Sequence, residues 1–318
     1  MARFLFHRLW QSALVLGLMS FAVYSLIGLM PGDPVDLMIT ADPKITAEDA
    51  ARLRELYGLN KSIVERYGNW LAAALSGDFG YSRLHAQPVM QVILPALGNT
   101  VTLLGLSFTL ALMIALPAGI AAAYRPYSKT DYAINMVAFA GISVPPFWLA
   151  LMLIIVFAVI FGILPAGGLG TLGVGGIWEN ARYLVLPVAS LTIASVGGHT
   201  RYMRAAMIET LRQDYIRTAR ATGATEARVV FGHALRNALI PVITVAGIYL
   251  GALLSGTIIL EAIFNLPGLG QGIILAATLR DYPVMQSLTA LMVFLMMSVN
   301  LLVDVLYVFI DPRISYST

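Results

Sequence analysis

Long stretches without charged residues recur along the chain, and their lengths indicate what kind of protein it is. The first covers residues 9–32 and follows Arg3, His7 and Arg8. It is longer than the roughly 20 residues that a helix needs to cross a hydrocarbon core. It is also long for a cleaved signal peptide, and it lacks a small-residue cleavage site. We therefore expect an anchoring first membrane helix.

Five further apolar segments are each long enough for one crossing. They predict helices at residues 99–123, 134–164, 183–200, 238–260 and 284–303. Pro145 and Pro146 are expected to kink the second of these, because interior prolines remove backbone hydrogen bonds. The third is the weakest candidate, since Gly197, Gly198 and His199 interrupt it. The pattern predicts an all-α membrane protein with six transmembrane helices.

The basic residues indicate the side of the membrane on which each loop lies. If both termini are cytoplasmic, arginines and lysines concentrate on the inner loops, and the short outer loops hold only Arg182 and Arg280. Inner loops are expected to carry this excess. The long segment after the first helix is then extracytoplasmic. We divide the chain into residues 1–95, the first helix with that segment; 96–310, the main membrane domain; and 311–318, a cytoplasmic tail.

One long charged segment, residues 202–238, lies between the fourth and fifth predicted spans. Its apolar residues recur at three- and four-residue steps, which predicts two helices. The first set is Met203, Met207, Ile208, Leu211, Tyr215 and Ala219, and the second is Ala227, Val230, Phe231, Ala234, Leu235 and Ala238. Gly223 can form the turn between them without a steric penalty. We expect a helical hairpin whose apolar stripe runs unbroken from the fourth span through Ala219.

Two interpretations of this hairpin are open. A charged loop is usually a solvated face, which here would only hold the orientation of the chain. The small residues at the tip would instead let a partner protein approach the backbone closely; they are Ala219, Ala221, Thr222 and Ala224. The order of residues in the segment bears on this choice.

The segment resembles the EAA motif, a cytoplasmic loop of permease subunits in ATP-binding-cassette (ABC) importers. The resemblance rests on R-T-A-x-x-x-G at residues 217–223 and H-A-L-R-N-A-L-I-P at residues 233–241, a form similar to the dipeptide and oligopeptide branch. Arg217 stands where the motif has its name-giving glutamate, and Thr218 where it has its first alanine. Arg236 replaces the usual late proline.

The resemblance extends over nearly the whole chain and implies the type I ABC importer permease fold. It implies a non-catalytic, B-type permease subunit of the bacterial inner membrane that carries dipeptides or oligopeptides, in a family that also carries nickel complexes and glutathione. The implied partners are a second similar permease, two ATP-binding subunits and an extracytoplasmic solute-binding protein. ATP and Mg²⁺ would be bound by the ATP-binding subunits, so no cofactor is expected in this chain.

The resemblance also implies roles for individual residues. Those expected to face the ATPase are Arg217, Thr218, Ala219, Arg220, Thr222, Gly223 and Ala224. Gly223 would set the turn, while Arg236 and Asn237 would tie the second helix of the hairpin to the membrane end. The substrate pathway stays unassigned, because the spans are too apolar for periodicity to show which face lines it.

The predicted outer segments carry further motifs that match the family. Residues 47–67 predict an amphipathic helix starting at Asp42 or Thr46, which either packs on the outer rim or contacts a partner. P-G-D-P at 31–34 and G-D-F-G-Y-S at 77–82 predict flanking turns. E-x-x-F-x-x-P-G-x-G, beginning at Glu261, predicts a tight re-entry turn after the fifth span, and D-P-R at 311–313 closes the sixth on the inner side.

Composition agrees with a bilayer protein and excludes several other classes. Of 318 residues, 58% are hydrophobic and 12% charged. The absence of cysteine excludes disulfides and thiolate metal sites, and a net charge of +3 is too small to suggest a nucleic-acid partner. The motifs G-x-x-x-x-G-K-[ST], H-E-x-x-H and G-x-S-x-G are absent, so we expect no enzyme active site of these types.

An ion-coupled secondary transporter or channel is the alternative function. Carboxylates inside a membrane are costly and commonly mark ion paths. The candidates are Glu261, which ends the fifth span, and Asp304, one turn after Asn300 in the sixth, with structural pairing or capping as the other role. Both are expected close enough to an interface to be hydrated. His199 is expected to be an interfacial anchor rather than a metal ligand.

Overall fold

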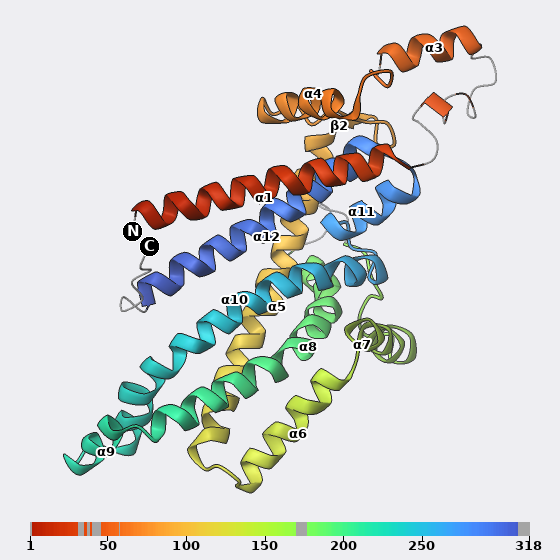
Figure 1. Cartoon of the computed structure of the whole chain (residues 1–318). Coiled ribbons are helices and arrows are strands. Elements are labelled where there is room, and N and C mark those ends of the chain that lie inside the picture. The colour runs from red at the N-terminus through yellow and green to blue at the C-terminus, as the bar shows by residue number, and fades with distance from the viewer. Residues whose placement is uncertain are drawn as a thin grey trace. The chain divides into compact units, whose positions relative to one another are not determined.

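The computed structural model describes residues 2–30, 35–36, 39, 46–56, 58–169 and 177–310. Nearly all of them are helical, and the sheet found among them is a two-stranded hairpin, β1 Tyr81–Ser82 paired antiparallel with β2 Gln87–Pro88 (Figure 1). The chain divides into two compact units. The first is Met1–Gly98 with Gly268–Met297, and the second is Asn99–Pro267 with Ser298–Thr318.

The first unit contains α1, α3, α4, α11 and the first part of α12. Their bounds are Ala2–Gly28, Ala47–Leu56, Ile63–Leu75, Leu269–Thr278 and Tyr282–Ile310. Tyr67 ties α4 to α1, since its hydroxyl is 2.7 Å from Ser20 Oγ and its ring meets Phe21 edge-on at 5.1 Å. A separate apolar core joins the first turns of α5 to α11 and α12; it includes Val89, Ile93, Leu269, Val284 and Leu288.

The amphipathic segment 47–67 forms two helices rather than the single helix expected. α3 begins with a capping box, in which the Asp49 N–H donates to Thr46 Oγ1 and the Thr46 N–H donates to Asp49 Oδ2. A turn follows at Gly58, whose φ is 65°, before α4 begins after its cap, Ser62. Thr46 is therefore the start. Asp42 lies outside the described residues, as do the P-G-D-P and D-P-R motifs.

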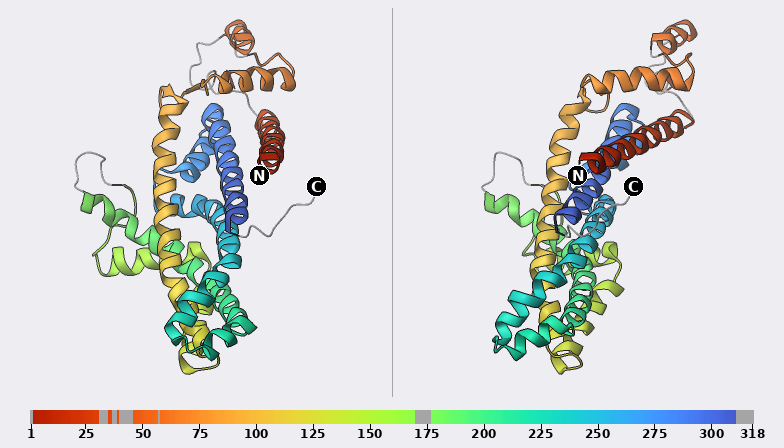
Figure 2. Two further views of the ribbon diagram at one scale, coloured as in Figure 1. Left: turned by 90° about the vertical axis from the view of Figure 1, so that its left-hand side faces the viewer. Right: turned by 60° about the vertical axis from the view of Figure 1, so that its left-hand side comes forward.

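The second unit is a bundle of helices that follow one another along the chain (Figure 2). α5, Val89–Tyr124, has its first turns in the first unit and continues here. The elements after it are α6 Lys129–Ser143, α7 Pro146–Leu153, the π-helical η1 Ile154–Ile160, α8 Ile177–Leu211, α9 Asp214–Ala221, the π-helical η2 Arg228–Ala234 and α10 Leu235–Ile263.

Among the described residues, five helices are long and apolar enough to cross a membrane. They are Phe6–Gly28, Val89–Tyr124, Ala181–Leu211, Arg228–Ile263 and Tyr282–Val305. Each matches one predicted span, although α5 begins well before residue 99 and α8 extends beyond 183–200 at both ends. The count becomes six when α6 and the helix after it are taken as one broken span.

The predicted span 134–164 does not form one kinked helix. α6 ends at Ser143, the next helix starts at Pro146, and the pair is bent by 95°. The cause is that two prolines are adjacent. A residue before a proline is pushed out of helical geometry, and here both Val144, with ψ 123°, and Pro145, with ψ 134°, are extended. The predicted position of the bend is confirmed, but the expected continuity of the helix is wrong.

The glycines that weakened the prediction of 183–200 are packing positions rather than breaks. A Cβ on Gly197 would lie 2.2 Å from the carbonyl oxygen of Ala138 on α6. A Cβ on Gly198 would lie 2.6 Å from the hydroxyl of Tyr249 on α10. Small residues at such positions let helix backbones approach closely. α8 is therefore uninterrupted here, and the two glycines mark where α6 and α10 pack against it.

His199 is buried and is not the interfacial anchor that we expected. Its exposed fraction is 1%, and its Nδ1 is 2.8 Å from the carbonyl oxygen of Ser195 one turn earlier in α8. The imidazole packs between the rings of Phe108 and Tyr249, with centroid distances of 5.9 and 4.7 Å. The same close approach of α10 that requires Gly198 therefore covers the next residue.

Candidate functional site

The charged segment folds as a hairpin, and its first arm is not the unbroken helix that we expected. α8 ends at Leu211 and α9 begins at Asp214. Gln213 between them is extended, with ψ 151°. The Arg212 and Gln213 N–H groups donate to carbonyls three residues earlier, which closes the last turn of α8. The apolar stripe through Ala219 is thus interrupted, and α9 is a separate short helix.

Gly223 forms the turn of the hairpin, as the sequence predicts. Its φ is 84°, in a region that side chains with a Cβ rarely adopt. The Gly223 N–H donates to Arg220 O at 3.0 Å, and the Ala224 N–H donates to Ala219 O at 3.1 Å. These two bonds make a Schellman motif that satisfies the last carbonyls of α9. A Cβ on Gly223 would meet nothing within 4 Å, so the backbone conformation, and not a lack of space, favours glycine.

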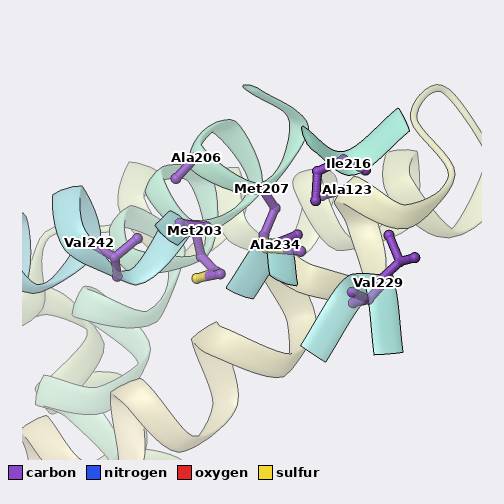
Figure 3. Packing of buried hydrophobic residues seen from close by; sticks show 10 residues of the cluster. Ala123, Met203, Ala206, Met207, Ile216, Val229, Ala234 and Val242 are labelled. Atoms are coloured by element: carbon purple, nitrogen blue, oxygen red, sulfur yellow. The ribbon is translucent and has the colours of Figure 1, made fainter. Parts of the chain in front are cut away.

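A buried core fixes both arms to the membrane helices (Figure 3). It contains Ala123, Met203, Ala206, Met207, Ile216, Val229, Val230, Ala234, Ala238 and Val242. Ile216 is the fully buried residue of α9, and it packs in this cluster with residues from α5, α8 and η2. Burying one such side chain contributes roughly 1.5–3 kcal/mol. α9 is short and lies beyond a break, yet this contact couples its position to α8 and to the end of α5.

The seven residues predicted to face a partner lie together around the turn. Arg217, Thr218, Arg220, Thr222 and Gly223 are exposed, and Ala219 and Ala224 are half-buried. Arg217 Nη1 is 3.4 Å from Asp214 Oδ1, and Arg220 Nε is 2.9 Å from Glu226 Oε1 on the far side of the turn. The hydrogen bonds that the Arg220 guanidinium donates to the Glu226 carboxylate raise the pKa of the guanidinium. The turn therefore presents small side chains and hydroxyls between two arginines whose charges are locally balanced.

Asn237 and Arg236 occupy different environments at the base of the second arm. The side-chain amide of Asn237 donates to the Tyr215 hydroxyl on α9 at 2.9 Å and to His233 O at 3.4 Å. Its contact thus crosses the hairpin and joins the two arms. Arg236 is exposed and forms no ion pair with another described residue within 4 Å.

Asp131 and Arg204 form an ion pair below the hairpin that sequence reasoning missed. Arg204 Nε and Nη2 on α8 each lie 2.6 Å from one carboxylate oxygen of Asp131 on α6. The Tyr127 N–H also donates to this carboxylate, and Asn135 donates a further bond. A local signal was present, because Ser128 caps α6 by accepting from the Asp131 N–H. The pairing of Asp131 with Arg204 could not be predicted, because the two residues are far apart in the sequence and no pattern connects them.

The two carboxylates considered for ion transport differ in their surroundings. Glu261 has an exposed fraction of 1% and accepts a hydrogen bond from Thr100 Oγ1 at 2.7 Å, so the expectation that it is hydrated is wrong. Asp304 is half-buried in α12. In the part of the chain that the structure describes, no group of three or more histidine or acidic side chains could hold a metal ion. The structure therefore gives Glu261 a hydrogen-bonded, structural setting.

The sequence matches two family models that together cover most of the chain. Residues 115–316 match the model described as the binding-protein-dependent transport system inner membrane component, and residues 1–104 match the model of the N-terminal part of such membrane components. The second model ends close to residue 98, where the first stretch of the first compact unit also ends.

Full-length relatives and solved structures give the same picture. The chain is 42% identical to the oligopeptide transport system permease protein AppB of Bacillus subtilis over 99% of its own length and 100% of AppB. It is 38% identical to the dipeptide transport system permease protein DppB of Alkalihalophilus pseudofirmus, covering 94% and 95% of the two chains. A chain of the inward-facing MetNI methionine ABC transporter matches with a TM-score of 0.58 and 21% identity, covering 70% of this chain and 97% of that one. This last match concerns the fold alone.

Proposed function

This chain belongs to the family of binding-protein-dependent transport system inner membrane components, and we propose that it forms part of the translocation pathway of an ATP-driven importer of dipeptides or oligopeptides. The cargo class is supported by AppB and DppB, which are named for oligopeptide and dipeptide transport and align with this chain over nearly its whole length. The chain is a non-catalytic subunit. ATP and Mg²⁺ would be bound by partner subunits.

The proposed assembly pairs this chain with a second, homologous permease, two ATP-binding subunits and an extracytoplasmic solute-binding protein. Its place is the bacterial inner membrane, with both termini in the cytoplasm and the segment after α1 outside. In this topology the hairpin at Gly223 lies on the same side as the ATPase. The charge distribution supports this topology, because the basic residues of the hairpin then lie on the cytoplasmic side together with those of the other inner loops.

The observation that carries the proposal is the architecture of the hairpin. Its turn is exposed and lined by small side chains, so another protein can approach its backbone. Directly behind the turn, Ile216 is buried in the core shared with α5 and α8. A partner that moved α9 would therefore displace the ends of two membrane helices, which is the kind of rigid coupling that switching between two states requires.

Purification of the tagged chain from membranes tests this function directly. We expect ATP-hydrolysing subunits and a second permease to co-elute, and the captured binding protein to retain a short peptide. In proteoliposomes, uptake of that peptide should require ATP on the side of the membrane where the ATP-binding subunits lie. It should require no ion gradient. Peptide uptake by the isolated chain driven by an ion gradient would instead establish the secondary-transporter alternative.

The topology has its own test, because the chain contains no cysteine. Single cysteines at Thr225 in the hairpin and at Lys61 after α3 would be labelled in intact cells with a membrane-impermeant maleimide. We expect labelling of Lys61→Cys alone before lysis and of both variants afterwards. Labelling of Thr225→Cys in intact cells would contradict the proposed orientation.

A further inference from the structure

The first compact unit contains a cavity of about 700 Å³ that has no place in the coupling proposal. Its walls come from the end of α1, from Leu59 and α4, from residues 78–83, which include β1, and from the junction of α11 and α12. Aromatic rings supply much of the wall, among them Tyr24, Trp70 and Tyr282. Cavities of this size with mostly apolar walls and a few converging polar groups are typical of small-molecule sites.

Residues that line this cavity carry unsatisfied polar atoms. Of the buried side-chain nitrogen and oxygen atoms without a hydrogen-bond partner in the described residues, four belong to the cavity wall: Arg66 Nε, Trp70 Nε1, Asp281 Oδ1 and Gln286 Nε2. An unsatisfied buried donor or acceptor is costly, so such groups normally have a partner. Three of these atoms are donors and one is a carboxylate oxygen.

The charged residues of the cavity wall include Arg66 and Asp281, with Asp78, Arg83 and Arg280. Arg66 is half-buried and has no acidic partner within 4 Å among the described residues, and its Nη2 would be 3.6 Å from a Cβ on Gly28 of α1. Asp281 is buried, and its Oδ2 accepts from Ser82 Oγ at 2.6 Å, whereas Oδ1 has no partner. The wall can therefore receive a ligand that carries an anion and a hydrogen-bond donor together.

The position of the cavity indicates where such a ligand comes from. The apolar span of α1 ends at Gly28 and that of α12 begins at Tyr282, and both residues line the cavity. This is the level at which a hydrocarbon core gives way to head groups, where Trp and Tyr are enriched. Beside the cavity, Leu26 of α1 and Leu29 just after it have exposed fractions of 66% and 73%, which leaves an apolar surface that acyl chains can cover.

We propose that this cavity binds the head group of a phospholipid that carries an ammonium group, such as phosphatidylethanolamine. Arg66 and the Trp70 indole N–H donate to its phosphate, with the Gln286 amide as a third donor. The ammonium group donates to Asp281 Oδ1, a bond that a quaternary choline head cannot make. The site is independent of the cargo and of the coupling hairpin.

The test is native mass spectrometry of the purified, delipidated assembly, titrated with dihexanoyl phosphatidylethanolamine and its phosphatidylcholine counterpart. We expect the ethanolamine lipid to bind at least about tenfold more tightly than the choline lipid. Arg66→Gln should weaken its binding by about tenfold or more, since it removes a charged hydrogen bond. Trp70→Phe keeps the ring and deletes only the N–H, so it should weaken binding by a few-fold. The control is Arg52→Gln, on an exposed residue of α3 outside the cavity wall.

Inorganic phosphate and a dipeptide serve as competitors and separate the other sources of the same chemistry. The proposal expects neither to displace the ethanolamine lipid at millimolar concentration. Displacement by phosphate would show a free-anion site, and displacement by the dipeptide a cargo site; either would overturn the lipid assignment. Equal binding of both lipids, or equal effects of Arg66→Gln and Arg52→Gln, would do the same. Elution of each variant with its partner subunits checks that it has folded.

Discussion

Arg204 holds Asp131 with two nitrogen atoms at once, Nε 2.6 Å from Oδ1 and Nη2 2.6 Å from Oδ2. The carboxylate is at the start of α6 and the guanidinium is on α8, just before the hairpin. Their side chains have exposed fractions of 3% and 23%, so the pair is largely withdrawn from solvent. A planar guanidinium matches a carboxylate in this two-point geometry, which a lysine cannot reproduce. The pair therefore fixes the orientation of α6 relative to the base of the hairpin.

Asp131→Asn should lower the free energy of unfolding by about 2–3 kcal/mol. The substitution leaves the mostly buried guanidinium of Arg204 without its anion. The free-energy cost of this unpaired charge is larger than the net stability that the intact pair contributes. The measurement is the unfolding free energy in detergent at neutral pH. Asp214→Asn is the matched control, because its carboxylate is 96% exposed and pairs with Arg217 at 3.4 Å; we expect a change below about 0.5 kcal/mol. Equal losses in the two variants would contradict the structural role of the Asp131–Arg204 pair.

Gly223→Pro should abolish ATP-driven uptake without preventing membrane insertion. Proline removes the N–H that donates to Arg220 O, and its φ is fixed near −65° where the structure has 84°. The Schellman turn cannot form, so the exposed residues of α9 lose their position. The measurements are peptide uptake and the ATPase activity of the assembled complex.

Gly223→Asn is the control for that variant. Asparagine adopts the left-handed conformation more readily than most residues, and the site has room for its Cβ. We expect near-normal uptake, with a stability loss of roughly 1 kcal/mol. Normal uptake by the proline variant would show that the turn does not couple the chain to the ATPase.

Signals that act within one turn of helix could be predicted from the sequence. Thr46 and Asp49 form the capping box at the start of α3, and Gly223 forms the turn between α9 and η2. In each case the residue type itself selects the backbone conformation. The break at Gln213 carried no such residue, so the end of α8 was missed. The adjacent prolines were recognised, but their combined restriction on Val144 and Pro145 was underestimated.

Contacts between distant segments could not be predicted in the same way. Arg204 was counted among the basic residues of a loop, because nothing in the periodicity shows that Asp131 lies opposite it. His199 was predicted to lie at a membrane interface. Its burial could not be predicted, because the rings that cover it, Phe108 and Tyr249, come from other helices. The coupling residues could be proposed because they are contiguous in sequence, whereas the cavity beside α1 is assembled from segments that are far apart in it.

Gly197→Ala should destabilise the protein by about 1–3 kcal/mol through overpacking. The added Cβ would lie 2.2 Å from the backbone oxygen of Ala138, so α6 and α8 must separate. Gly105→Ala on α5 is the matched control, because its Cβ would meet nothing within 4 Å. Alanine is the better helix former, and we expect no loss there or a gain of up to about 1 kcal/mol. Thermal unfolding of both variants in one detergent checks the difference, and equal midpoints would contradict the close packing of α6 on α8.

Glu261→Gln should leave ATP-driven peptide uptake within about twofold of the unmodified chain. Glu261 is buried with an exposed fraction of 1%, and Thr100 Oγ1 donates to its Oε1 at 2.7 Å. A glutamine side chain has nearly the same shape and keeps a carbonyl oxygen that can accept this bond, but it cannot carry a proton in a relay. The role of Glu261 in the structure is thus preserved while any role in ion transport is removed.

The measurement for Glu261→Gln is uptake in proteoliposomes, driven either by ATP or by a pH gradient alone. Thr100→Val is the companion variant; it deletes the donor and should lower stability by about 1 kcal/mol without changing the energy source for uptake. If Glu261→Gln abolished uptake while the complex stayed assembled, and if a pH gradient alone drove uptake by the unmodified chain, the carboxylate would belong to an ion path. Glu261 is buried in α10 and accepts a hydrogen bond from Thr100 of α5, so we expect Glu261→Gln to leave ATP-driven uptake unchanged and a pH gradient alone to drive none.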